Sequence, residues 1–210
     1  MSTRVKFCGM TSVADVELAR AAGADAYGMI FAPSARRISF ETAREIARAE
    51  IGGITPVAVM VDPHADDVAR VRELFPDALV QLSGTESPAF AASLGGTILK
   101  AVHVGDDDTP EELAAACNRY APALILCDTK VPGAYGGTGE TFAWERVARL
   151  ARWRPLMVAG GLTPENVGAC VRLIRPFGVD VRSGVETDGR KDARKMMQFV
   201  RAVRESDAAA

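Results

Sequence analysis

Cys8 and Asp128 are the two residues whose types and positions could carry out acid–base chemistry. Each stands where a short apolar run stops: Cys8 in VKFCGMT, and Asp128 in ILCDTKVPG, which opens into a glycine-rich loop. A thiol and a carboxyl group that meet in one site offer the base and the acid that an isomerase needs to move a proton between two atoms. Taken singly, each also has a structural interpretation, because small cysteines are often buried and strand-end aspartates often cap helices or pair with cations.

Alternation along the strands indicates which side chains share a face with this pair. Lys6 lies on the same face as Cys8, and Leu126 lies on the same face as Asp128, so that Cys127 points the other way. A buried ammonium beside a thiol favours the thiolate, whereas apolar surroundings oppose it. The direction in which the pKa of Cys8 shifts is therefore open from these residues alone.

Glycines gather after three expected strands in the second half of the chain. Without a Cβ, glycine lets backbone N–H groups approach an anion, and the loops after the last strands of a parallel barrel often hold phosphate. Glycine is also common in ordinary turns, so one pair alone would be weak evidence. Together the clusters indicate a phosphate site, built by Gly136, Gly137, Gly139, Gly160, Gly161, Ser183 and Gly184.

Other polar residues could complete a substrate site. In the loop PSARRISF, Arg36 or Arg37 could hold a second anionic group by bidentate hydrogen bonds, or be a solvated loop charge. Asp180 and Arg182 share one face of a later strand, so they could pair with each other or contact a substrate.

The remaining polar residues carry weaker signals. Gln81 and Ser83 share the inner face at the end of the fourth expected strand, where both could simply satisfy backbone groups. His64 and His103 lack partners at ligand spacing, and we interpret them as structural or surface residues. No disulfide framework or structural zinc is indicated, because the four cysteines show neither CxxC nor Cys/His spacing: Cys8, Cys117, Cys127 and Cys170.

Short β-branched or apolar runs alternate with longer amphipathic segments along the whole chain, which predicts an α/β fold. The expected strands cover 5–9, 26–31, 56–61, 78–82, 97–104, 123–128, 155–159 and 178–181. The expected helices cover 13–22, 40–49, 66–74, 110–120, 143–150, 164–174 and 192–204, with a weaker one at 87–94. Thr109 and Thr163 each precede a proline at the first helical position.

Eight strand–helix units in 210 residues predict a compact (β/α)8 barrel, whose first and eighth strands should be hydrogen-bonded neighbours. A doubly wound open sheet is the competing architecture. With no linker or composition shift, we expect one domain over residues 1–210. Barrel active sites lie at the C-terminal strand ends, where Cys8 and Asp128 stand.

Composition narrows the class of partner. The 25 basic and 27 acidic residues give a formal charge of −2 without long runs of one sign, which argues against nucleic acid or an anionic membrane and favours a small molecule. The N-terminus lacks the apolar run of a signal peptide, and no segment approaches the roughly 18 apolar residues of a membrane span. We therefore expect a cytoplasmic protein.

Several motifs together resemble those of the phosphoribosylanthranilate isomerase family of tryptophan biosynthesis. They follow one another over nearly the whole chain: VKFCGMT, GADAYGMIF, SARRIS, LVQLSG, LCDTKVPGAYGGTGETFAW, AGGLTPENV and GVDVRSGVE. The resemblance implies a (β/α)8 isomerase without metal or organic cofactor, as a monomer or a homodimer. Its reaction would be the Amadori rearrangement of N-(5-phospho-β-D-ribosyl)anthranilate to the 1-deoxyribulose 5-phosphate isomer.

The resemblance also implies roles for individual residues. Cys8 matches the family's general base and Asp128 its general acid, which calls for a lowered pKa of the thiol and a raised pKa of the carboxyl group. Arg36 would contact the anthranilate carboxylate, Asp180 the sugar hydroxyls or the anthranilate amine, and Gln81 the substrate. Phosphate would lie among the backbone amides of Gly137, Thr138, Gly139, Gly160, Gly161, Ser183 and Gly184.

Two departures from the family pattern bear on substrate binding. Ser83 stands where the family often has the histidine of QLHG, and Arg182 stands where a small residue is usual, so substrate affinity and range stay open. The rivals are the histidine-pathway isomerase that performs the same rearrangement, a bifunctional version of both, and a non-catalytic phosphate-binding barrel. Cys8 argues against the first, which has an aspartate there, and the Cys8 and Asp128 pair argues against the last.

Overall fold

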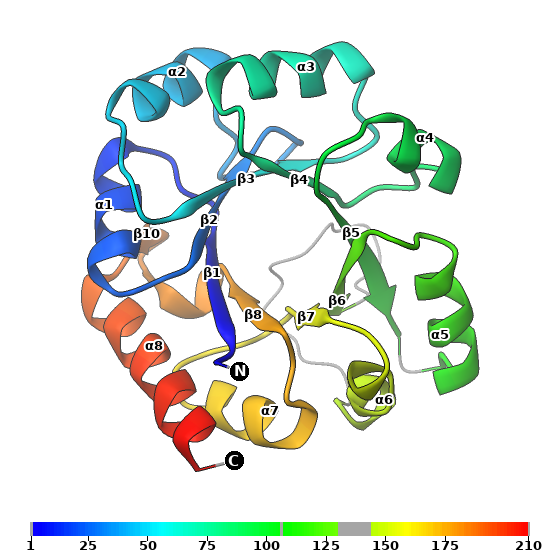
Figure 1. Ribbon diagram of the computed structural model, residues 1–210. Coiled ribbons are helices and arrows are strands. Elements are labelled where there is room, and N and C mark those ends of the chain that lie inside the picture. Colours follow the sequence, from blue (N-terminus) through cyan, green and yellow to red (C-terminus); the bar gives the residue numbers. More distant parts are fainter. Residues whose placement is uncertain (1, 106, 130–143, 210) are drawn as a thin grey trace.

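A closed barrel of parallel strands forms the centre of the computed structural model, which describes residues 2–105, 107–129 and 144–209 (Figure 1). Each strand pairs with the strands that precede and follow it in the sequence. This is expected, because parallel neighbours need a crossover connection that returns the chain to the end of the barrel where the strands begin. The strands are β1 (Arg4–Cys8), β2 (Ala26–Ile30), β3 (Thr55–Met60), β4 (Leu79–Leu82), β5 (Ile98–Val104), β6 (Leu124–Thr129), β7 (Leu156–Val158) and β8 (Gly178–Val181).

The helices form an outer ring around the strands (Figure 1). Serine or threonine caps begin several of them, with Ser12, Ser39, Ser87 and Thr109 each accepting a backbone N–H of the first turn. The helices are α1 (Val13–Ala21), α2 (Phe40–Arg48), α3 (Ala65–Leu74), α4 (Pro88–Ser93), α5 (Pro110–Asn118), α6 (Glu145–Ala148), α7 (Val167–Ile174) and α8 (Ala193–Ala208), with the short 3-10 helices η1 (Leu150–Arg152) and η2 (Ser183–Val185).

Two local features differ from the sequence predictions. The helix expected from residue 164 begins at Val167, because Asn166 accepts the Thr163 N–H at 2.8 Å and residues 164–166 form a turn. A two-stranded antiparallel hairpin, β9 (Glu186–Thr187) and β10 (Arg190–Lys191), was not predicted. At two residues each, its strands are too short to leave an alternation pattern in the sequence.

Pairing of the first and eighth strands closes the barrel. The parallel register places Lys6 beside Asp180 and Phe7 beside Val181. The two ends of the chain meet at the same seam, since the Thr3 N–H donates to the Asp207 carboxylate at 2.8 Å (Figure 1). The predicted (β/α)8 barrel is confirmed, and the open doubly wound sheet is excluded.

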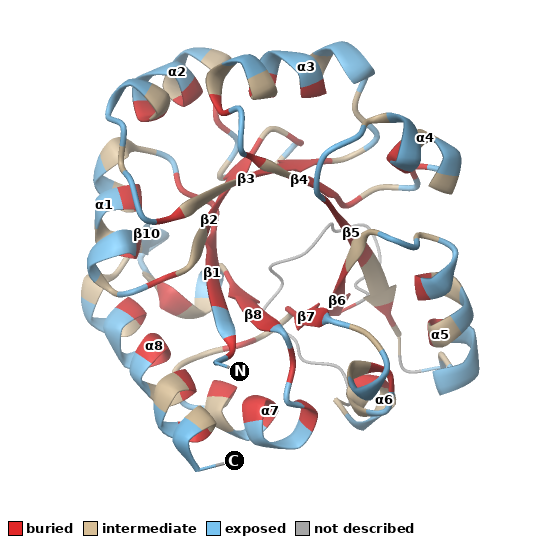
Figure 2. Cartoon of the chain, viewed as in Figure 1, coloured by how far each residue is buried: buried red, intermediate tan, exposed pale blue. Residues whose placement is uncertain are grey.

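The apolar core has two shells, as expected for strands that are buried on both faces. Outward-facing strand residues pack against the helices, and Phe7 meets Phe199 of α8 edge to face, with ring centroids 5.9 Å apart. Inward-facing residues form smaller clusters, one of them around Leu99 and Leu126. Figure 2 shows the strands buried along most of their length and the outer faces of the helices exposed.

Within the described part of the chain, the helices are too short or too polar to cross a membrane.

Phe199→Ala should remove most of the packing at the seam between β1 and α8. Truncating a buried phenylalanine costs about 3–5 kcal/mol, so we expect a loss of that size in the free energy of unfolding, measured by urea denaturation. Met197 lies on the same helix but is 54% exposed, so Met197→Ala should cost no more than about 0.5 kcal/mol. Equal losses in the two variants would contradict this description of the core.

Candidate active site

A cavity lies at the C-terminal ends of the barrel strands and brings together most of the predicted site residues. Cys8 and Asp128, the predicted acid–base pair, both line it, although they lie far apart in the sequence. The other predicted residues that line it are Gln81, Gly160, Gly161, Asp180 and Ser183. Ser83 and Arg182, where the chain departs from the family pattern, line it too.

A buried ion pair involves Asp180, one of the residues that line this cavity. Lys6 Nζ lies 2.9 Å from Asp180 Oδ1, and the side chains are 1% and 8% exposed. Lys6 and Cys8 both point into the barrel, as strand alternation predicted. Gly28 of β2 makes room for them, because a Cβ there would lie 2.9 Å from Cys8 Sγ and 3.1 Å from Lys6 Nζ. In the sequence, the position of Gly28 inside an expected strand was the feature that could have indicated this close approach.

Burial and the neighbouring ion pair together determine the pKa of the Cys8 thiol. Burial is the largest influence and raises the pKa of Cys8; the Lys6 ammonium lowers it, and the Asp180 carboxylate raises it again. Since Asp180 largely neutralises Lys6, the net pKa of Cys8 lies above the ordinary value of a thiol. The pKa of Cys8 is thus raised, opposite to the lowered pKa that the family resemblance implied.

Asp128 shifts in the direction that an acid requires. Burial raises its pKa to about 6; His103 acts against the rise, and the Asp180 carboxylate adds to it. The Thr129 N–H donates to Asp128 Oδ1 at 2.9 Å, which stabilises the ionised form and limits the shift. The pKa of Asp128 is thus raised, the direction expected of an acid.

The end of β4 meets the end of β5 at this site. The Gln81 side-chain amide donates to Ser83 Oγ at 3.1 Å, and His103 Nε2 lies 3.2 Å from the Ser83 main-chain oxygen. His103, which we interpreted from the sequence as a structural or surface residue, lines the cavity. In the sequence, its alternation with Leu99 and Ala101, which face the interior, could have indicated this position.

Arg36 lies beside the cavity rather than in its wall. Its guanidinium donates to Glu186, with Nη2 2.7 Å from Oε2 and Nε 3.3 Å from Oε1. Lys191 Nζ also donates to Glu186, at 2.9 Å. Although burial alone would raise it, these bonds hold the pKa of Glu186 below its ordinary value. The unpredicted hairpin β9–β10 therefore supplies the carboxylate that orients Arg36.

The loops after β7 and β8 form the described part of the predicted phosphate site. Gly160 and Gly161 have φ angles of +88° and +58°, in the left-handed region that favours glycine. A Cβ on Gly184 would collide with the carbonyl group of Leu162, so the two loops pack directly against each other. The predicted phosphate contacts of Gly137, Thr138 and Gly139 lie outside the described residues.

Across the described ranges, no group of three histidine, cysteine or acidic side chains is arranged to hold a metal ion.

Comparison with known proteins assigns the chain to a family. A family model described as N-(5'phosphoribosyl)anthranilate (PRA) isomerase matches residues 5–202. The N-(5'-phosphoribosyl)anthranilate isomerases of Desulforudis audaxviator and Roseiflexus castenholzii are 40% and 42% identical to it, over 97% and 95% of this chain and 99% and 97% of theirs. The chain belongs to the N-(5'-phosphoribosyl)anthranilate isomerase family.

Solved structures of this isomerase family share the barrel. That from Thermotoga maritima superposes with a TM-score of 0.86 at 35% identity, covering 97% of this chain and 99% of its own. Another, in complex with reduced 1-(o-carboxyphenylamino)-1-deoxyribulose 5-phosphate, has a TM-score of 0.83 at 33% identity, with the same coverage. A further Thermotoga maritima structure is of monomers generated from a dimeric phosphoribosylanthranilate isomerase. The predicted isomerase class and barrel fold are thus confirmed.

In this isomerase, Asp180→Asn should make the Cys8 thiol more reactive. The change removes a negative charge that raises the pKa of Cys8 and leaves the Lys6 ammonium beside the thiol. We expect alkylation of Cys8 by iodoacetamide at pH 8 to speed up roughly three- to tenfold, because the thiolate is the nucleophile.

Peptide mass spectrometry would follow Cys8 alongside Cys170, an internal control whose pKa burial raises to about 12. An unchanged rate at Cys8 in the folded variant would show that Asp180 does not control its ionisation.

Proposed function

We propose that the protein converts N-(5'-phosphoribosyl)anthranilate to 1-(o-carboxyphenylamino)-1-deoxyribulose 5-phosphate in tryptophan biosynthesis, with Cys8 as general base and Asp128 as general acid. One observation carries the proposal: in a chain of the isomerase family, the thiol and a carboxyl group of raised pKa line a single cavity at the C-terminal end of the barrel. Barrel enzymes place their chemistry at this end.

Asp128 acts first, as the acid that opens the sugar ring. Its proton passes to the ring oxygen as the bond between that oxygen and C1 breaks, leaving an iminium ion. A carboxyl group with a pKa of about 6 holds its proton at neutral pH more often than an ordinary aspartate. Burial next to Asp180 is what supports this role.

Cys8 acts second, as the base. Its thiolate takes the proton from C2 of the sugar, and the resulting enolamine tautomerises to the ketone. The pKa of Cys8 is raised, so the productive arrangement, with the proton on Asp128 and the thiolate on Cys8, is the minor form of a pair that shares one proton. Each general acid–base step typically contributes about 10²–10⁴-fold to the rate.

The substrate carries two anionic groups, a phosphate and a carboxylate, and each is assigned its own contacts. We infer that phosphate binds the loops of Gly160, Gly161, Ser183 and Gly184, together with the predicted contacts of Gly137, Thr138 and Gly139. Arg36 would hold the anthranilate carboxylate, a role supported by its present bidentate hold on the Glu186 carboxylate. Asp180 and Gln81, both on the cavity wall, would contact the sugar and the anthranilate amine.

Turnover of phosphoribosylanthranilate tests the proposal. The substrate would be generated from anthranilate and phosphoribosyl pyrophosphate and followed by anthranilate fluorescence. Cys8→Ala and Asp128→Asn should each lower kcat by at least about 100-fold, since each removes one proton-transfer group. The control is Cys170→Ala, which removes a thiol on the buried face of α7 that is no part of the cavity.

Circular dichroism would show that each variant is folded. Near-normal turnover by a folded Asp128→Asn protein would refute the acid role while leaving the isomerase activity intact. Absence of turnover by the folded wild type would instead refute the substrate assignment and favour a phosphate-binding barrel that has lost catalysis.

The pH dependence of kcat/KM should show an acidic limb near pH 6. Between the pKa of Asp128, about 6, and the higher pKa of Cys8, the pair holds one proton and includes the productive form. As the pH falls through 6 the pair gains a second proton, the thiolate is lost, and kcat/KM should fall about tenfold per pH unit.

The substrate's phosphate also titrates near pH 6, so a second variant is needed to assign the limb. Asp180→Asn removes a charge that raises the pKa of Asp128, and its limb should lie at lower pH than that of the wild type. A wild-type limb near pH 4, or one that Asp180→Asn leaves in place, would contradict the assignment.

A further inference from the structure

His103 lies beside the proposed acid, on the neighbouring strand. The register of β5 and β6 pairs His103 with Asp128, as it pairs Ala101 with Leu126 one layer below. Ala101 and Leu126 are in the interior cluster of the barrel, so His103 and Asp128 face the same cavity. Adjacent strands lie about 4.8 Å apart, which brings an imidazole within electrostatic reach of the carboxyl group.

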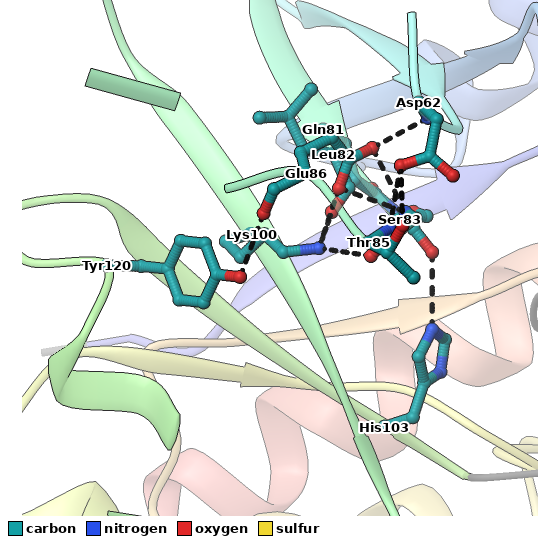
Figure 3. Close-up of polar contacts among 10 residues, drawn as sticks. Asp62, Gln81, Leu82, Ser83, Thr85, Glu86, Lys100, His103 and Tyr120 are labelled. Carbon is teal, nitrogen blue, oxygen red and sulfur yellow. Dashed lines mark hydrogen bonds and ion pairs between the residues drawn. The ribbon is translucent and has the colours of Figure 1, made fainter. Parts of the chain in front are cut away.

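One hydrogen bond fixes how the imidazole is held. His103 Nε2 lies 3.2 Å from the Ser83 main-chain oxygen, as Figure 3 shows. A carbonyl oxygen can only accept, so Nε2 carries the proton and donates it. This hydrogen bond is compatible with the positively charged imidazolium, in which both ring nitrogens are protonated.

The segment that carries this oxygen is held in place by a buried ion pair behind it. Lys100 and Glu86 are 2% and 1% exposed, with Nζ 2.8 Å from Oε2, and Lys100 also donates to the Gly84 oxygen at 2.7 Å. The other oxygen of Glu86 accepts the N–H groups of Asp62 at 2.9 Å and Gly84 at 3.0 Å. Figure 3 shows these contacts gathered on the loop that follows Ser83.

This network leaves the Ser83 oxygen little freedom. A buried ammonium or carboxylate that lost its partner would cost several kcal/mol, so the loop after β4 is held in one conformation. The Ser83 N–H is itself fixed, because it donates to the Met60 oxygen at 2.8 Å. The acceptor for His103 is therefore preorganised by groups that do not reach the cavity.

Charged groups approach Asp128 from three strands. His103 comes from β5, Asp180 and Arg182 extend from β8, and β1 carries Lys6, which is paired with Asp180, below Cys8. After burial, which raises the pKa of Asp128, His103 is the largest influence and lowers it, ahead of Asp180, which raises it, and Arg182. Among these groups, His103 therefore does most to lower the pKa of Asp128.

We propose that His103 is a positioning residue of the isomerase reaction: held by the Ser83 main-chain oxygen, its imidazolium stabilises the ionised carboxylate of Asp128 and so sets the pH range over which Asp128 can hold its proton. The inference rests on the proposed acid role of Asp128. The imidazole is the side chain whose charge changes between pH 5 and 8, the range in which a carboxyl group so placed exchanges its proton.

The first test compares the pH dependence of kcat/KM in His103→Gln and His64→Gln. Loss of the imidazolium should move the acidic limb to higher pH by at least about half a unit, because an opposite charge at this range shifts a neighbouring pKa by roughly a unit or more. His64 is the only other histidine in the sequence and lies exposed at the start of α3, so His64→Gln should leave the limb unchanged.

The second test needs no catalysis and keeps His103 in place. In the His64→Gln protein a single histidine remains, and its imidazole NMR signal can be titrated without ambiguity. Asp128→Asn in that background should move the titration of His103 to lower pH, by an amount matching the shift of the limb, because coupling between two sites is reciprocal.

Three outcomes are distinguishable. A limb and an NMR titration that both stay in place, while folded Asp128→Asn is inactive, would overturn the role of His103 and leave the proposed function standing. Near-normal turnover by Asp128→Asn would overturn the acid role, and the role of His103 with it. If His103→Gln fails to fold, the NMR titration decides alone, and a shift to lower pH supports the proposal.

Discussion

The ion pair between Lys6 and Asp180 is the interaction on which the candidate active site depends. Its two members come from the first and last strands of the barrel, 174 residues apart in the sequence, and meet only because β1 pairs with β8. A buried ammonium without a partner would be costly, so closure of the barrel and burial of these charges require each other. Gly28 completes the arrangement by leaving space for both Lys6 and Cys8.

Burial and this pairing together determine the resting protonation of Cys8 and Asp128. An unpaired Lys6 would favour the thiolate of Cys8, but Asp180 takes up most of that charge and burial prevails, so the thiol keeps its proton. The same Asp180 carboxylate raises the pKa of Asp128, which burial already raises. Both shifts have one main origin, the cost of negative charge at a buried position, and the pair therefore holds its shared proton mainly on Cys8. Catalysis under the proposed roles begins with moving it.

The count of eight strand–helix units was sufficient to predict the barrel, because the fold repeats one unit. Strand alternation was sufficient to predict the inward direction of Lys6, Cys8 and Asp128. It could not predict which side chains meet across strands, since register is fixed by closure of the whole sheet. The contact of His103 with the Ser83 main chain depends on that register, and so does its place beside Asp128. The sign of the Cys8 shift depends on the balance of three opposing influences, which no pattern of residue types encodes.

The raised pKa of Asp128 is tested most directly by titrating the aspartate carboxyl carbons by ¹³C NMR in the protein without substrate. The Asp128→Asn variant is the reference that identifies the signal. The titration observes the carboxyl group itself, without substrate, turnover or assumed catalytic roles. We expect the signal absent from Asp128→Asn to titrate with a midpoint of about 6. A midpoint near 4, the range of an ordinary exposed aspartate, would mean that the cavity does not disfavour negative charge on Asp128 and would contradict its raised pKa.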